Sequence, residues 1–164
     1  MNEQEEYVEK TKRLLKSYNA LRVTLANQEA RIQLKKYELR LGEAAPISKY
    51  GDAPRGGSQE LNAVEKAAAR RITIEETIGR LQAEAQKTRY AIDTVDRCLR
   101  ALPTDEQALV REHYFDCLDW RSIGESRHYS ERWARQRGHE VVERIARMIF
   151  WGVQQMELDF LLEE

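Results

Sequence analysis

The sequence predicts an all-α fold in which a long antiparallel helical hairpin is followed by a module of shorter helices. Charged residues make up 34% of the 164 residues and aromatic residues only 8%, with three prolines; this composition is typical of long solvated helices. Two long stretches repeat apolar residues every three or four positions, as helices that pack along their length do. A segment rich in glycine and proline separates the two stretches, so the chain can turn back between them.

The first long helix is predicted from about Glu3 to Leu41, a stretch without proline or glycine. Gln28 and Lys35 interrupt its apolar seam, which weakens the coiled-coil signal. The helix should end at Gly42, because glycine favours the position just after a helix. The apolar residues of the seam recur at heptad-like spacing and are Tyr7, Leu14, Tyr18, Leu21, Leu25, Ile32 and Leu39.

A second long helix is predicted from about Gln59 to Leu102. The connecting segment 42–58 holds two prolines and four glycines, and we expect it to be a mobile loop. Neither long helix can bury its stripe alone. The two should therefore pair as a hairpin over residues 1–101, or pair with copies of themselves in a homo-oligomer. The stripe of the second helix consists of Ile74, Ile78, Leu81, Ala85, Ile92, Val95, Leu99 and Leu102.

Residues 102–149 form the predicted C-terminal domain. Its first helix should begin after Pro103, because Thr104 and Gln107 have the spacing of a capping box, in which each side chain satisfies a backbone N–H at the helix start. The apolar pattern of this helix ends near Cys117. The sequence therefore predicts one short helix between the hairpin and the next turn.

A further short helix and a tight turn come next. Asp119 is the predicted N-cap of the short helix, with Trp120 and Ile123 as its apolar anchors. In the turn, His128 stands where a left-handed backbone conformation is needed, and histidine tolerates this better than most residues other than glycine. Ser130 can then cap a longer helix by accepting a backbone N–H of its first turn.

The longer helix has two distinct faces. Tyr129, one residue before the cap, can pack onto the apolar face of the helix that it introduces. Steps of 100° per residue place an inward set on one side. Short helix, tight turn and longer helix together have the outline of a helix-turn-helix, in which the second helix enters the major groove of DNA. The inward set comprises Ala134, Gly138, Val141, Ile145 and Met148.

The outward face of this helix carries the candidate DNA-binding residues. Arginine can bind guanine O6 and N7 through two hydrogen bonds, and glutamine can bind adenine N6 and N7 in the same way. The first turns of a recognition helix meet the base edges, whereas residues of the preceding helix and turn meet phosphates. The predicted base-contacting residues are Arg132, Arg135, Gln136 and His139. The predicted phosphate-contacting residues are Arg121, Arg127 and Ser130.

A simpler interpretation is that this arginine-rich face is only solvated. Glu131 and Arg135 have the spacing of an i,i+4 ion pair, and so do Glu140 and Arg144. The net charge of the chain is −1, so no overall basic charge indicates a nucleic-acid partner. DNA binding would therefore have to come from a local group of cations.

The residues from Leu102 to Ala146 also carry a resemblance. They resemble the fourth region of sigma factors and, more closely, the helix-turn-helix of phage late-gene transcriptional regulators of the RinA and ArpU type. The long helical first half and the glycine-containing loop are similar to that family in architecture alone. The matching residues are Leu102, Pro103, Glu106, Leu109, Tyr114, Phe115, Leu118, Trp120, Ile123, Glu125, Tyr129, Ser130, Glu131 and Arg132.

The resemblance implies a transcriptional regulator that binds double-stranded DNA. Such a protein would activate phage or prophage late genes in the cytoplasm of a bacterial host, and it would contact the host RNA polymerase while bound upstream. This chain departs from the pattern at Arg127, where leucine is expected, and at Ala134 and Gly138, where bulky aliphatic residues are expected. We expect Trp120 and Phe115 to fill the space that the two small residues leave.

Other kinds of site find little support in the sequence. His113 and Cys117 are four residues apart on a helix, but nothing supplies the remaining ligands of a zinc site. The chain has no phosphate-binding loop or nucleophile motif, so we expect neither an enzyme nor a cofactor. Its two cysteines suit a reducing compartment. No signal-peptide pattern or membrane-spanning apolar segment is evident, so we expect a cytoplasmic protein without a membrane partner.

Two other functions fit the same pattern. One is a phage DNA-packaging protein of the small-terminase kind, which also joins a helix-turn-helix to an oligomerising helical region. In those proteins, however, the helix-turn-helix usually comes first. The other is a coiled-coil adaptor without DNA binding. The apolar-rich tail 150–164 needs a partner, which would be the hairpin, a second copy of the chain or another protein.

Overall fold

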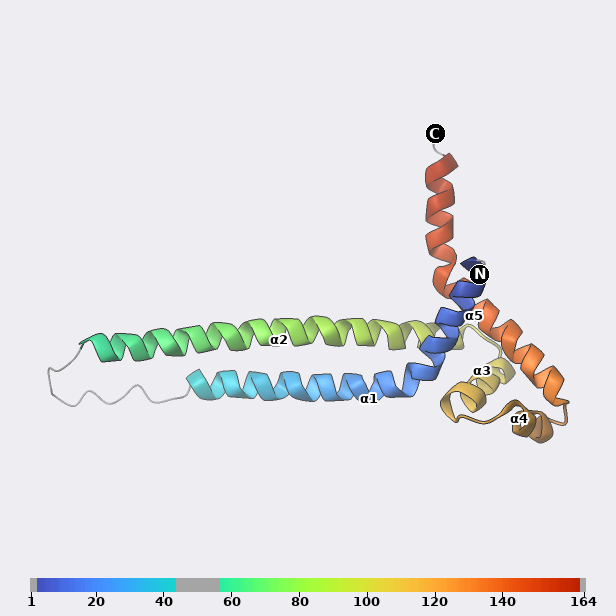
Figure 1. The fold of residues 1–164 in the computed structure, drawn as a ribbon, viewed down its shortest axis with the longest axis horizontal. Helices are drawn as coiled ribbons and strands as arrows, with labels where there is room; N and C mark the ends of the chain where they lie inside the picture. The colour runs from blue at the N-terminus through green and yellow to red at the C-terminus, as the bar shows by residue number, and fades with distance from the viewer. Residues whose placement is uncertain (1–2, 44–56, 163–164) are drawn as a thin grey trace. The chain divides into compact units, whose positions relative to one another are not determined.

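The computed structural model describes the backbone of residues 3–43 and 57–162, and the side chains of 3–42 and 62–150. Every regular element in these ranges is a helix, which confirms the all-α prediction (Figure 1). The order is α1 (Glu3–Glu43), α2 (Gly57–Arg100), α3 (Thr104–Val110), the single π-helical turn η1 (Arg111–Phe115), α4 (Trp120–Arg127) and α5 (Glu131–Leu162). Most of the predicted loop, residues 44–56, lies outside the described residues.

Residues 23–89 form one unit, in which α1 and α2 lie side by side as the predicted hairpin (Figure 1). Its buried core contains Ile32 on α1 and Leu81 and Ala85 on α2. Arg89 forms an ion pair with Glu29 on the facing helix. The two long helices therefore pair within one chain, and this choice was left open by their apolar patterns.

The same unit exposes several large apolar side chains. Leu34, Tyr37 and Leu41 of α1 are each more than half exposed and recur at steps of three and four residues. These side chains lie outside the seam with α2. A homo-oligomer, in which such residues would be covered, stays a prediction.

Residues 1–22 and 90–164 form the second unit, which contains the short helices. The first turns of α1 contribute Leu15 to its core, and the end of α2 contributes Val95 and Leu99. The α5 helix packs against α3 and α4 and contributes Val141 and Ile145, both fully buried. This core holds the short helices and the first turns of α5 in a fixed relation, which the candidate site requires.

Candidate nucleic-acid interface

The α4 helix has the predicted cap at its start. The Asp119 carboxylate accepts a hydrogen bond from the Ser122 backbone N–H at 2.7 Å, and this bond holds the pKa of Asp119 below its usual value. Ile123 is fully buried. Asp119 and Ile123 therefore act as predicted, the first by satisfying a free backbone N–H and the second by anchoring the helix.

The turn after α4 is closed by backbone hydrogen bonds. His128 takes the predicted left-handed conformation, with φ 60°. The Tyr129 N–H donates to the Gly124 carbonyl at 2.8 Å, and the His128 N–H donates to the Glu125 carbonyl at 3.3 Å. This is the hydrogen-bond pattern of a Schellman motif. Gly124 also allows the close approach, because a Cβ at this residue would lie 2.8 Å from the Tyr129 carbonyl oxygen.

The α5 helix starts at the predicted residue. The Ser130 hydroxyl accepts a hydrogen bond from the Trp133 N–H at 3.1 Å, which confirms Ser130 as the N-cap. Tyr129 does not pack on the apolar face as expected. Its ring stacks on that of Trp133 with centroids 3.9 Å apart, and both side chains are more than 40% exposed. Trp133 is four residues after Tyr129, a spacing at which two side chains can meet along a helix, so the Tyr129 ring meets an exposed ring and not the buried face.

The inward face of α5 agrees with the prediction except at its end. Ala134, Gly138, Val141 and Ile145 are buried, whereas Met148 is 39% exposed. The start of α1 packs on α5 beside Met148 and does not cover it: Tyr7 of α1 stacks on Phe150 of α5. The buried stripe therefore turns away from Met148.

The space left by the small residues of α5 is filled by one of the two predicted side chains. Trp120 lies against Gly138, where an added Cβ would meet its ring carbons at 3.0 Å or less. On its other side the Trp120 ring stacks on His113 at 3.7 Å. Phe115, the other predicted filler, stacks on Tyr18 of α1 instead, a partner 97 residues away that spacing along the chain does not reveal.

The four predicted base-contacting side chains are all exposed in the first turns of α5. Arg135 forms an ion pair with Glu131, which is one of the two i,i+4 pairs expected of a solvated face. The Gln136 amide donates to Glu140 at 3.3 Å, and His139 lies 3.3 Å from Glu143. Arg132 has no ion pair with any residue that the structure describes. The contacts that would have to be exchanged for contacts with DNA are therefore weak or missing at Arg132, Arg135, Gln136 and His139.

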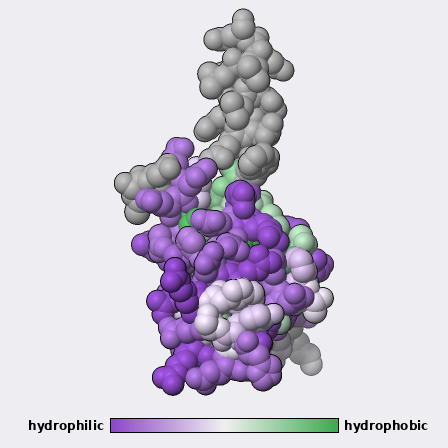
Figure 2. Space-filling model, turned by 90° about the vertical axis from the view of Figure 1, so that its right-hand side faces the viewer, coloured by the Kyte–Doolittle hydropathy of each residue, from purple (hydrophilic) through white to green (hydrophobic). Residues whose placement is uncertain are grey.

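A groove of about 550 Å³ brings these four side chains together with residues from three other elements. Its aromatic wall consists of His113, Tyr114 and Trp120. Lys12 and Lys16 of α1 also line the groove, a contribution that the sequence did not reveal. The surface seen from the side of these helices is predominantly hydrophilic (Figure 2), as expected of an interface with a charged polymer.

The three predicted phosphate-contacting residues differ in their surroundings. Arg121 is paired with Glu125 at 3.0 Å, and both side chains are more than two-thirds exposed. Ser130 uses its hydroxyl as the cap. The Arg127 guanidinium donates two hydrogen bonds to Glu112, at 2.8 and 3.1 Å, and only 23% of its side chain is exposed. Arg127 therefore ties α4 to η1, and this contact occupies the place of the expected leucine.

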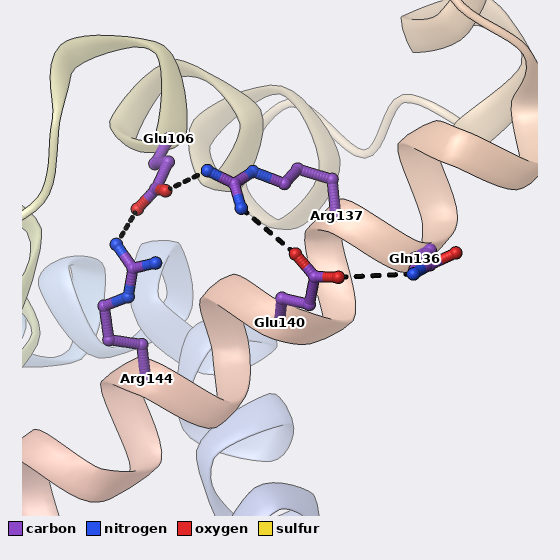
Figure 3. Close-up of polar contacts among 5 residues, drawn as sticks. All are labelled: Glu106, Gln136, Arg137, Glu140 and Arg144. Carbon is purple, nitrogen blue, oxygen red and sulfur yellow. Dashed lines mark hydrogen bonds and ion pairs between the residues drawn. The ribbon is translucent and has the colours of Figure 1, made fainter.

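A buried carboxylate, Glu106, connects α3 to α5 (Figure 3). Glu106 is only 4% exposed. Arg137 and Arg144 of α5 donate to its two oxygens at 2.6 and 2.7 Å. Glu140 pairs with Arg137 at 3.0 Å, so the expected Glu140–Arg144 pair is wrong, because Arg144 reaches Glu106 instead. No local pattern in the sequence predicts this cluster, since Arg137 and Arg144 lie 31 and 38 residues after Glu106 in the chain.

The predicted capping box at the start of α3 does not form. The α3 helix begins at Thr104, so that Pro103 occupies the N-cap position and no side chain caps the helix. The Glu106 and Gln107 N–H groups both donate to the Pro103 carbonyl at 3.0 Å. The Gln107 amide instead reaches back to the Leu102 carbonyl at 2.9 Å.

His113 and Cys117 do not lie in a metal-binding arrangement. The His113 ring Nδ1 is 2.8 Å from the Leu118 carbonyl, and burial lowers the pKa of the imidazole. Cys117 is exposed and has a left-handed backbone with φ 58°. Within the described part of the chain, no three His, Cys, Asp or Glu side chains gather as metal ligands would. Across the same residues, no helix combines the length and apolar character needed to cross a bilayer.

Comparison of the chain with protein-family models, curated proteins and solved structures finds no match. The resemblance to phage late-gene regulators therefore depends on the matching residues of the C-terminal domain alone.

Proposed function

We propose that the protein binds double-stranded DNA through a helix-turn-helix formed by α4, the turn 128–130 and α5, and that α5 reads base edges in the major groove. One observation carries this proposal. The first turns of α5 expose two arginines, a glutamine and a histidine on one face, directly after a tight turn, while the opposite face of the helix is buried. A helix held in this way can enter a groove with its long polar side chains leading.

The proposed reading uses hydrogen bonds to bases. Arg132 and Arg135 can each bind guanine O6 and N7, and Gln136 can bind adenine N6 and N7. Arg135 must first leave Glu131, but the two side chains are 66% and 46% exposed, and exposed ion pairs contribute about 0–1 kcal/mol. The exchange of that carboxylate for a base therefore has a small cost.

Phosphate contacts would add affinity that does not depend on sequence. Arg121 is free to turn toward a phosphate, because its pair with Glu125 is exposed. Ser130 lies at the start of α5, where backbone N–H groups also favour an anion. Arg127 is left out of this set, because its guanidinium is engaged by Glu112.

The resemblance of the C-terminal domain extends the proposal from binding to regulation. A regulator of the RinA and ArpU type would activate late genes of a phage or prophage. It would do so in the cytoplasm of the bacterial host, with the host RNA polymerase as its second partner. Seven of the 14 residues that match the family lie in the proposed helix-turn-helix, and the other seven lie in the segment from Leu102 to Leu118 that precedes it.

Selection from random duplex DNA at near-physiological salt tests the proposed function. The expected result is enrichment of one sequence motif by the full chain. Recovery of duplexes without a common motif would contradict base reading, and absence of any salt-sensitive binding would favour a coiled-coil adaptor. Stoichiometry by light scattering then separates a regulator, expected as a monomer or dimer, from a ring-forming packaging protein.

A further inference from the structure

The groove beside α5 is lined in part by cations of α1, which lies outside the proposed helix-turn-helix. Lys12 and Lys16, one turn apart on α1, line it together with Arg132 and Arg135 of α5. Among the side chains that the structure describes, none of those lining the groove is acidic. Four cations from two separate helices therefore face one hollow, although the net charge of the chain is −1.

The two lysines differ in how they are held. Lys16 is exposed and has no ion pair with any described residue. Lys12 pairs with Glu9 at 2.7 Å, and 29% of its side chain is exposed. Burial is the main cause that lowers the pKa of His113, and the positive charge of Lys16 lowers it further. This is expected if the Lys16 ammonium group lies near the aromatic wall. Lys16 is thus the more available of the two for an anion.

The positive region ends abruptly along α1. A neighbouring hollow of about 530 Å³ shares Lys12 and His139 with the groove, but it is also lined by Glu5, Glu9 and Glu143. A polyanion following the groove would be repelled beyond His139. The change of sign would limit a DNA interface to the first turns of α5, where the predicted base-contacting side chains lie.

We propose that Lys12 and Lys16 bind phosphates of the DNA strand that borders the base pairs read by α5, so that the first turns of α1 are part of the DNA interface. A helix in the major groove is flanked by sugar-phosphate backbone, and lysine binds phosphate as a point charge without reading sequence. The two lysines would supply the contacts that Arg127 cannot. They can do so only if the proposed DNA binding by α5 holds.

The test measures the dissociation constant of the full chain for a selected duplex and a random duplex of equal length, from 50 to 200 mM salt. Each lost phosphate contact should reduce the slope of log affinity against log salt by about 0.9. Raising the salt from 50 to 200 mM should therefore weaken DNA binding by Lys16→Ala about 3.5-fold less than it weakens binding by the unaltered chain. For Lys12→Ala combined with Lys16→Ala, the weakening should be about 12-fold smaller, with the two duplexes affected alike.

Two control variants keep the measurement specific. Lys10→Ala removes an α1 lysine that pairs with Glu6 and does not line the groove, and it should leave the slope unchanged. Lys16→Arg keeps the charge and should also keep the slope. The inference about the lysines would be overturned if the double lysine variant kept the salt slope of the unaltered chain. If Arg135→Ala still lost selectivity in the same experiment, the proposed function would stand. Failure of the unaltered chain to bind either duplex would overturn the proposed function as well.

Discussion

Four arginines on α5 carry the same charge in opposite surroundings. Arg137 and Arg144 turn toward α3 and hold the buried Glu106 from both sides (Figure 3). Arg132 and Arg135 point to solvent, and the only carboxylate that either contacts among the described residues is the exposed Glu131. The residue type is therefore no guide to the role of an arginine on this helix. The burial of its partner decides the role.

The first prediction concerns the inner pair and has the largest expected effect. Arg137→Ala combined with Arg144→Ala leaves the Glu106 carboxylate buried and without a cation, which should destabilise the chain by about 3–5 kcal/mol. Chemical denaturation followed by circular dichroism measures the loss. Adding Glu106→Leu should restore much of it, because an apolar side chain carries no charge to desolvate.

The matched change on the outer face is Arg132→Ala combined with Arg135→Ala. This variant should unfold at the same denaturant concentration as the unaltered chain, since exposed side chains contribute little to stability. Equal destabilisation by the inner and outer double variants would contradict the division between them.

The second prediction concerns the contact between α4 and α5. Gly138→Ala should destabilise by about 1–3 kcal/mol through overpacking, because the added methyl group meets the Trp120 ring, which His113 confines on its other side. Thermal unfolding checks this. Gly79→Ala is the control, because no atom lies within 4 Å of its added Cβ, and it should stabilise the helix by about 1 kcal/mol. Stabilisation by both variants would show that Trp120 yields freely.

The third prediction separates the two arginines that flank α4. Arg127→Ala should destabilise by about 1–2 kcal/mol, since it breaks two hydrogen bonds to a charged partner in a partly buried pair. Arg121→Ala should leave stability unchanged, because its pair is fully solvated. Denaturation midpoints of the two variants provide the comparison. A salt-dependent loss of DNA affinity in Arg127→Ala without loss of stability would return Arg127 to the phosphate set.

The fourth prediction is a pH dependence and is the smallest. Burial lowers the pKa of His113 from its ordinary 6.5, so protons bind the unfolded chain more readily than the folded one. Stability should therefore decrease as the pH falls through about 6.5 toward the lower pKa of the folded state. Unfolding between pH 7.5 and 5.5, above the range in which the carboxylates titrate, measures this slope. His113→Phe should flatten it, and an unchanged slope would refute the cause.

Local signals explain which parts of the structure were predictable. Asp119, His128 and Ser130 act on backbone groups within five residues, so their roles follow from the sequence nearby. The same holds for the seam of the hairpin and for the buried residues from Ala134 to Ile145. The contacts of Glu106 with α5, of Phe115 with Tyr18 and of Lys16 with the groove join segments far apart in the chain. No periodicity along the chain reveals these contacts.

The most direct test of base reading by α5 is the ratio of affinities for the selected duplex and for a random duplex. Arg135→Ala should reduce this ratio by a factor equivalent to about 1–3 kcal/mol of binding free energy, and reselection with the variant should show relaxed preference at one base position. Arg147→Ala, which removes an exposed arginine beyond the first turns of the same helix, should leave the ratio unchanged. Equal loss of affinity for both duplexes in Arg135→Ala would contradict base reading by this face.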